Sequence, residues 1–207
     1  MSHTLRLEGV RIALRGQVLV DLDAEIRPGQ VLTVMGPSGS GKSTLLAYLA
    51  GFLDPVFQAA GRILLDGADI TGEPAETRRI GLLFQDALLF PHLSVAGNLL
   101  FGLPRGPDRR QRASEALAQA GLAGFETRDP ATLSGGQQAR VALLRLLLSA
   151  PRAVLLDEPF AKLDSHLRGE MRTLVFDRLR AAGLPALLVT HDSADAEAAG
   201  GRIVRLT

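Results

Sequence analysis

The sequence predicts an α/β fold whose central sheet is largely parallel. Short apolar stretches typical of strands alternate with helical patterns along the 207 residues. That order favours parallel strands connected by helices. Hydrophobic residues make up 46% of the chain, which supports a sizeable core and argues against disorder. A glycine-rich segment placed between an apolar stretch and a helix is a third indication of this fold class.

The N-terminal residues predict a smaller antiparallel subdomain. Residues 5–12 and 18–26 alternate apolar and polar side chains, as half-buried antiparallel strands do. Pro28 and Gly29 then indicate a turn, and residues 31–35 form a continuous apolar run that predicts a buried strand. We expect the central sheet to start there.

Residues 86–150 differ from their surroundings, because their pattern is mostly helical and is interrupted by glycines and prolines. We interpret them as a helical subdomain inserted into a single domain spanning 1–207, whose core comprises residues 1–85 and 151–207. Other predicted elements are a helix over about 43–50, strands at 62–65, 80–84 and 153–156, a helix over 165–181, and strands at 186–189 and 202–206.

The loop after the first buried strand predicts a phosphate site. Gly36, Gly41, Lys42 and Ser43 satisfy the pattern Gly-x-x-x-x-Gly-Lys-Ser/Thr. Glycines let backbone N–H groups turn towards an anion, and the helix N-terminus adds positive partial charge. The lysine ammonium reaches the β- and γ-phosphates, and the serine hydroxyl can bind Mg²⁺. The predicted ATP-binding residues are Gly36, Pro37, Ser38, Gly39, Ser40, Gly41, Lys42, Ser43 and Thr44.

Lysine itself is rare in this chain. It occurs only at positions 42 and 162, whereas arginine is common throughout the chain. This usage suggests that arginine cannot replace Lys42 in its function. The alternative is that a lysine at this one position of an arginine-rich chain is due to chance. A ligand-free glycine turn remains the alternative for the whole loop, and the strand-to-helix context argues against it.

A pair of acidic residues follows a later predicted strand. Four apolar residues, 153–156, precede Asp157 and Glu158. Ligands of parallel sheets bind at the carboxyl ends of the strands, so both acids are expected near the phosphates. Asp157 is the predicted Mg²⁺ ligand, and Glu158 is the predicted catalytic group that polarises the attacking water. A solvated strand end would be the better interpretation if no phosphate loop were present.

Residues 133–137, Leu-Ser-Gly-Gly-Gln, start a predicted helix with Ser134 as its N-cap. This string resembles the signature of ATP-binding cassette (ABC) proteins, which are P-loop NTPases. The resemblance covers nearly the whole chain, with Walker A at 36–44 and Walker B at 153–157. It also identifies the Q-loop glutamine as Gln85, the D-loop aspartate as Asp164 and the switch histidine as His191.

The resemblance implies an ATPase built from two copies of the chain that sandwich two ATP molecules. Each site would combine the Walker residues of one chain with the signature of the other. His191 would contact the γ-phosphate, and Gln85 would sense Mg²⁺ and the attacking water, so both are expected to be catalytic together with Lys42 and Glu158. A monomer should then bind ATP but turn it over poorly. The expected nucleotide contacts outside Walker A are Gln85, Ser134, Gly135, Gly136, Gln137, Asp164 and His191, and the expected Mg²⁺ ligands are Ser43, Gln85 and Asp157.

The run 79–99 is rich in large apolar residues. Most of them are expected in the core of the helical subdomain, while part of the run could line a groove for a short helix of a membrane partner. The stretch is similar to that of bacterial importer cassettes, above all those for thiamine, polyamines and sulfate, including an uncharacterised thiamine-like branch. This implies permease subunits, a periplasmic solute-binding protein and a peripheral position on the cytoplasmic face of the inner membrane. No C-terminal regulatory domain is expected.

Three short stretches depart from the family pattern. Residues 13–16 contain no aromatic side chain to stack on adenine, which leaves Arg15 as a possible substitute. Residues 161–164 are Ala-Lys-Leu-Asp instead of Ser-Ala-Leu-Asp, so Lys162 places a charge at the expected dimer interface. Residues 138–140 are Gln-Ala-Arg where Arg-Gln-Arg is commoner.

A phosphate loop also occurs in proteins with two other functions. A soluble ABC ATPase of DNA repair or translation is disfavoured, because the chain lacks sustained heptads, has one cassette and carries a net charge of only +1. No nucleic-acid partner is therefore expected. A metabolite kinase would use the phosphate loop but has no role for the signature. The chain has no cysteine, so disulfides and thiolate chemistry are excluded.

Overall fold

The computed structural model describes residues 3–206, apart from the side chain of His166; residues 1, 2 and 207 of the predicted domain lie outside it. Within that range the central sheet has five strands in the order β6-β7-β8-β3-β9, and every pairing between them is parallel. This confirms the predicted α/β class. The strands are β3 (Val31–Met35), β6 (Ile80–Leu83), β7 (Ala153–Asp157), β8 (Ala186–Val189) and β9 (Ile203–Arg205).

The N-terminal strands form a separate antiparallel sheet in the order β2-β1-β4-β5. Its strands are β1 (Leu5–Leu14), β2 (Gln17–Ile26), β4 (Phe57–Leu65) and β5 (Ala68–Asp69). The register of β1 against β4 shifts between Glu8 and Arg11. Gly61 lies opposite this shift, where a Cβ atom would come within 2.4 Å of the Gly9 carbonyl oxygen, so the close approach of the two strands requires glycine.

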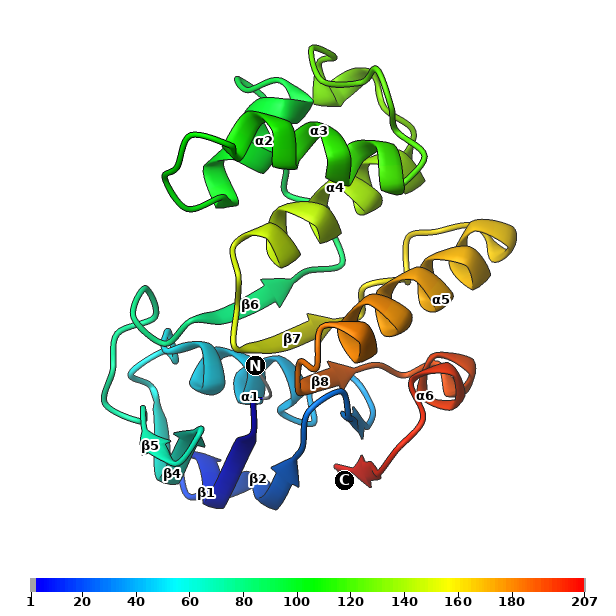
Figure 1. Cartoon of the computed structure of the whole chain (residues 1–207). Coiled ribbons are helices and arrows are strands. Elements are labelled where there is room, and N and C mark those ends of the chain that lie inside the picture. The colour runs from blue at the N-terminus through cyan, green and yellow to red at the C-terminus, as the bar shows by residue number, and fades with distance from the viewer. Residues whose placement is uncertain (1–2, 207) are drawn as a thin grey trace.

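Helix α1 (Lys42–Ala50) lies between the two sheets (Figure 1). Its buried leucines pack with the inner faces of β1, β2 and β4 and with one face of the central sheet in a single apolar cluster. The opposite face of the central sheet is covered by α4 (Gly135–Leu148) and α5 (Ser165–Ala181), whose apolar side chains form a second cluster with β7 and β8. Strands β3, β7 and β8 are therefore buried on both faces, as their continuous apolar sequences predict.

Most of residues 86–150 lies at one end of the molecule, away from the antiparallel sheet (Figure 1). This part contains α2 (Val95–Gly102), α3 (Arg109–Gln119), the short 3₁₀ helix η1 (Pro130–Thr132) and α4. Apolar side chains from α2, α3 and α4 form a third cluster around Leu99, Leu117 and Val141. Helix α4 belongs to both the second and the third clusters, so it joins the helices at this end to the central sheet.

Several element boundaries agree with the sequence prediction, and others differ for identifiable reasons. The bounds of β3, α5 and β8 are as predicted. Strand β4 starts at Phe57, earlier than the predicted residue 62, because pairing with β1 organises residues whose own pattern shows no alternation. Strand β5 and helix α6 (Ser193–Ala199) are too short to produce a recognisable period, and neither was predicted. None of the helices described combines the length and apolar composition needed to span a bilayer.

Candidate functional site

The glycine loop connects the buried strand β3 to the start of α1. Its two flanking glycines are required by close packing. A Cβ atom at Gly36 would lie 2.8 Å from the Leu206 carbonyl oxygen, and one at Gly41 would lie 3.0 Å from Leu19 Cβ. Gly41 also has φ 90°, a left-handed conformation that favours glycine. These constraints hold the loop close to the sheet, and within the loop the Ser40 N–H donates to the Pro37 carbonyl oxygen at 3.3 Å. The position of the loop at a helix N-terminus suits an anion.

Lys42 is the first residue of α1 and is only 8% exposed. Its ammonium group donates hydrogen bonds to the carbonyl oxygens of Gly36, at 2.8 Å, and Pro37, at 2.7 Å. An ammonium has three N–H donors, so two of them fix its position against the start of the loop. The positive charge is thereby held beside the helix N-terminus, where a phosphate group is favoured.

The loop forms one side of a cavity of about 580 Å³. Glu158 and His191 are part of its lining, although they follow different strands of the central sheet. His191 Nδ1 lies 3.1 Å from Glu158 Oε1. The structure thus brings three of the predicted catalytic residues, Lys42, Glu158 and His191, to one cavity, which is lined by Gly36, Pro37, Ser38, Gly39, Gly41, Lys42, Ser43, Thr44, Glu158 and His191.

Asp157 ends strand β7, and Glu158 follows it in a left-handed conformation with φ 44°. The Glu158 backbone N–H donates to the Val189 carbonyl oxygen at 3.0 Å, which fixes this turn to β8. Burial raises the pKa of the Asp157 carboxyl group, and the neighbouring Glu158 charge raises it further, while Lys42 opposes both effects. An excess of negative charge beside the loop is the environment in which a bound cation is favoured.

The charge on Asp157 therefore costs the free protein stability. Because its folded pKa lies above its unfolded value, the destabilisation is fully present above the folded pKa and is lost as the pH falls through the folded pKa to the unfolded value. We expect Asp157→Asn to raise the melting temperature of the nucleotide-free chain and to weaken Mg²⁺-dependent ATP binding. Calorimetry and nucleotide titration measure the two effects. Asp21→Asn, an exposed change on β2, is the control and should alter neither.

The signature string starts α4, and Ser134 is its N-cap, as expected. The Ser134 hydroxyl accepts a hydrogen bond from the Gln137 N–H at 3.3 Å, and the Gln137 side chain accepts one from the Ser134 N–H at 3.0 Å. Gly136 packs so closely against α5 that a Cβ atom would lie 2.1 Å from Leu167 Cδ2. Gly135 has open space around its Cα, so its backbone remains approachable.

The other predicted nucleotide contacts are not gathered at the loop cavity within this chain. Among residues 3–206, its lining includes neither the buried Ser40 and the signature residues 134–137 nor Gln85, Asp164 and Asp157. Gln85 and Gly135 line a different cleft beside Lys162. Asp164 is the N-cap of α5, where its carboxylate accepts from the Leu167 N–H at 3.0 Å. One chain therefore supplies only part of the predicted site.

Two polar residues, the half-buried Arg145 and the buried Asn98, have no counterpart in the sequence prediction. Arg145 of α4 donates to the Leu88 carbonyl oxygen at 2.9 Å and to the Ala87 carbonyl oxygen at 3.2 Å, directly after the Q-loop position. Asn98 is fully buried. Its side-chain oxygen accepts a hydrogen bond from the Phe90 N–H, and its side-chain nitrogen donates one to the Phe90 carbonyl oxygen. The one arginine within the otherwise apolar run 141–148 was the available signal for Arg145. Nothing in the sequence distinguishes Asn98 from an exposed asparagine.

The phosphate loop, the acids at the end of a strand of the same sheet and the capped Ser-Gly-Gly helix define an ATP-hydrolysing cassette. Comparison with known proteins agrees, since the family model described as ABC transporter matches residues 19–161. The chain belongs to this family, and it is an ATP-binding subunit with ATPase activity.

Similar proteins cover most of the chain. The uncharacterized ABC transporter ATP-binding protein YnjD of Escherichia coli K12 is 48% identical over 88% of this chain and 85% of its own. The thiamine import ATP-binding protein ThiQ of Jannaschia sp. CCS1 is 46% identical over 98% and 88%, respectively. The Fe(3+) ions import ATP-binding protein FbpC 1 of Rhizobium meliloti is 44% identical over 89% of this chain, which spans about half, 52%, of that longer relative.

Proposed function

We propose that this chain is the ATP-hydrolysing subunit of a bacterial importer of small solutes. The observation that carries the proposal is the shared cavity of the phosphate loop, Glu158 and His191. The direction of transport rests on similarity, because relatives identical at 44–48% include import proteins for thiamine and Fe(3+) ions. In this role the chain would lie on the cytoplasmic face of the inner membrane, with a permease and a periplasmic solute-binding protein as its partners.

The proposed chemistry divides among the residues of the cavity. Lys42 and the loop N–H groups would hold the β- and γ-phosphates and stabilise the charge that develops during transfer to water. Glu158 would accept the hydrogen bond of the attacking water and orient it towards the γ-phosphorus. His191 Nδ1 lies 3.1 Å from Glu158 Oε1, and the His191 side chain is 67% exposed and lines the cavity, so it can contact both the carboxylate and the γ-phosphate.

The residues around the loop also fit Mg²⁺. Ser43 is exposed in the cavity lining, and Asp157 is a half-buried carboxylate whose pKa is raised first by burial and then by the neighbouring Glu158 charge. Both offer the hard oxygen donors that this ion prefers, and no cluster of three or more acidic or histidine ligands occurs among the described residues. That donor set suits an ion that is shared with ATP phosphates. Mg²⁺ would supply charge neutralisation on the phosphate oxygens, with Gln85 as the proposed third contact.

A homodimer would complete the site. In one chain the capped start of α4 and Asp164 lie outside the loop cavity, so residues 134–137 are available to a second copy. The Gly135 backbone, with open space around it, would present N–H groups to the γ-phosphate of the partner's ATP. Within the single domain 1–207, the core, residues 1–85 and 151–207, would bind the nucleotide of its own copy. The helical part, residues 86–150, would contact the nucleotide of the partner copy.

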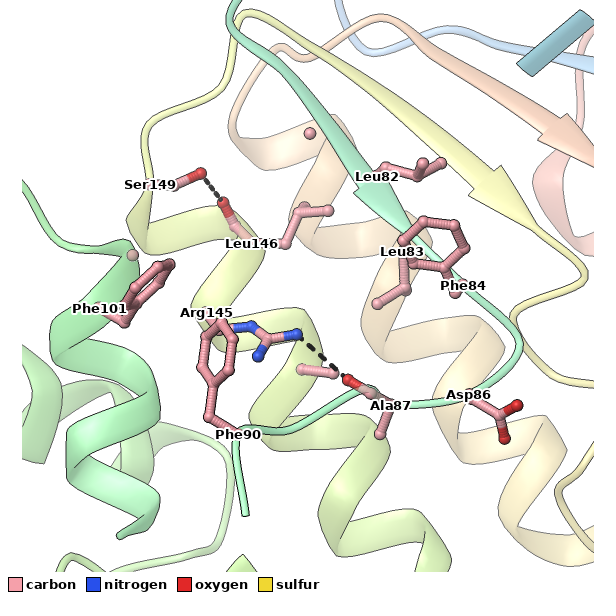
Figure 2. Close-up of a pocket in the computed structure, with 13 residues that line it drawn as sticks. Leu82, Leu83, Phe84, Asp86, Ala87, Phe90, Phe101, Arg145, Leu146 and Ser149 are labelled. Carbon is pink, nitrogen blue, oxygen red and sulfur yellow. Dashed lines mark hydrogen bonds between the residues drawn. The ribbon is translucent and has the colours of Figure 1, made fainter. Parts of the chain in front are cut away.

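The proposed permease site is a groove of about 260 Å³ between β6, α2 and α4 (Figure 2). Phe84, Phe90, Phe101 and Arg145 are part of its lining. The ring centroids of Phe90 and Phe101 are 4.5 Å apart, the Arg145 guanidinium lies 5.1 Å from the Phe90 centroid, and Figure 2 shows Phe90 between Phe101 and Arg145. Phe101 is 68% exposed and Phe84 is 39% exposed, which is unusual for phenylalanine on a free surface. An amphipathic helix of the permease would cover both rings.

Phe101→Ser is expected to abolish co-purification of the chain with its permease while leaving the ATPase activity of the isolated chain unchanged. The ring is exposed, so its loss removes binding surface without opening a cavity in the core. Ile203→Ser is the matched control, since Ile203 is also exposed, at 43%, but lies on β9, at the edge of the sheet opposite β6. Equal recovery of the permease with both variants would contradict this groove as the docking site.

A further inference from the structure

A network of charged side chains lies directly behind His191. It consists of Arg168 and Arg172 on α5 with Asp192 and Asp195 at the start of α6, and we call it the switch network. The two arginines are one helical turn apart and so share a face of α5. None of the four residues was singled out by the sequence, and none lines the phosphate cavity.

Arg168 connects this network to the D-loop, residues 161–164. One guanidinium nitrogen, Nη1, donates to Asp192 Oδ2 at 3.2 Å. The other, Nη2, donates to the carbonyl oxygen of Leu163 at 3.0 Å and reaches that of Ala161 at 3.5 Å. A planar guanidinium fixes the directions of both sets of bonds at once. The Arg168 side chain therefore fixes the distance between the D-loop backbone and Asp192, the residue after His191.

Arg172 fixes the other side of the switch segment. Its Nε donates to Asp195 Oδ1 at 2.5 Å, and its Nη2 donates to Asp192 Oδ2 at 3.2 Å. Asp195 is only 3% exposed and accepts a second hydrogen bond, at 3.0 Å, from the hydroxyl of Thr190. That hydroxyl in turn accepts from the Asp192 N–H at 3.1 Å. The residues on both sides of His191 are thus tied to α5.

His191 itself has little support of its own. Its side chain is 67% exposed, and its Nδ1 lies 3.1 Å from Glu158 Oε1. The direction of the imidazole ring therefore depends on the backbone between Thr190 and Asp192. Buried ion pairs contribute little net stability, because desolvation opposes the attraction, and the Nε of Arg168 is buried without a hydrogen-bond partner. The network is better explained by the geometry it imposes than by stability.

We infer that Arg168 and Arg172 are positioning residues that couple the D-loop to His191. The inference rests on the proposed function, in which the D-loop faces a second copy of the chain. When that copy contacts residues 161–164, displacement of the D-loop backbone would reach Asp192 through the Arg168 guanidinium. The His191 ring would then be aligned on Glu158 and the γ-phosphate only in the closed dimer. This explains in physical terms why a monomer would bind ATP but turn it over poorly.

The test is Arg168→Ala, assayed for steady-state ATP hydrolysis and for ATP binding by the isolated chain. Arg168 is preferred over Arg172 as the test position. Loss of Arg168 leaves Asp192 paired with Arg172, whereas loss of Arg172 would leave the buried Asp195 carboxylate without an arginine partner. We expect kcat to fall about tenfold or more, as misplacement of a catalytic group does, with KM and ATP affinity unchanged. Arg178→Ala, on the same helix but bound to Gln119, is the matched control.

Two further variants separate coupling from a merely structural role. Asp192→Asn keeps the N-cap of α6 and removes the charge, so it should reproduce the loss in kcat. The double variant that combines Arg168→Ala with Asp192→Asn should lose no more kcat than either single variant. Arg168→Lys should not restore kcat, because one ammonium cannot bridge Asp192 and Leu163 as the guanidinium does. Equal kcat for the Arg168 and Arg178 variants would overturn the inference, as would additive losses or a matching loss of ATP affinity and melting temperature. Failure of the proposed function would show instead as a wild-type chain without ATP turnover.

Discussion

Glu158→Gln is expected to lower ATP turnover by about 10²–10⁴-fold, the usual contribution of a general base. Glutamine keeps the size of the side chain and a carbonyl oxygen, but it cannot take up a proton from water. Glu158 Oε1 lies 3.1 Å from His191 Nδ1, and the side chain lines the phosphate cavity. No other acid lines that cavity among the described residues, so no neighbour is placed to replace it.

The same variant should retain ATP, because Lys42 and the loop are untouched. If two copies close on two nucleotides, ATP-bound dimers will accumulate, since the step that reopens them is blocked. Phosphate release measures turnover, and size-exclusion chromatography with ATP measures the dimer. Glu197→Gln, an exposed change on α6, serves as the control and should behave like the wild-type chain. Turnover at the wild-type rate in Glu158→Gln would show that Glu158 is not the catalytic base.

Lys42→Arg should weaken ATP binding almost as strongly as Lys42→Ala, by at least about tenfold, as loss of a charge-assisted hydrogen bond does. The ammonium fits between the carbonyl oxygens of Gly36 and Pro37 at 2.8 and 2.7 Å and is 8% exposed. A guanidinium is larger and planar, so it cannot occupy this position without moving the loop. The positive charge is thus conserved in the variant while the geometry is lost.

The control for this prediction uses the other lysine of the chain. Lys162 forms an exposed ion pair with Asp86, and an exposed pair of this kind tolerates arginine. Lys162→Arg should therefore leave ATP affinity unchanged. Titration with a fluorescent ATP analogue measures both variants. Wild-type affinity in Lys42→Arg would mean that the scarcity of lysine in this chain has no bearing on the site.

The parts of the site that the sequence predicted are those encoded in contiguous residues. The loop from Gly36 to Thr44 carries its own geometry, since glycine positions, the lysine and the helix start follow one another in the chain. The N-cap of α4 is equally local, because Ser134 and Gln137 exchange hydrogen bonds within a single turn. Strand β3 was predicted with correct bounds because it is one continuous apolar run, and helix α5 starts directly after its own N-cap, Asp164.

The parts that the sequence could not predict depend on residues that are distant along the chain. Strand β4 extends to Phe57 only because β1 lies beside it. The raised pKa of Asp157 needs both burial and the approach of its neighbours. The switch network joins α5 to the start of α6 through side chains that, read singly, look like ordinary surface charges of a helix.

The sequence by itself determined that this chain is a cassette ATPase, because the order of phosphate loop, signature and Asp-Glu pair specifies the chemistry. The tertiary structure decided which of those residues meet within one copy. It joins Lys42, Glu158 and His191 at one cavity and leaves the signature on another surface. The physical reason is that parallel pairing of β3, β7 and β8 brings their carboxyl ends to one edge, whereas the start of α4 is held apart from that edge by its packing on α5.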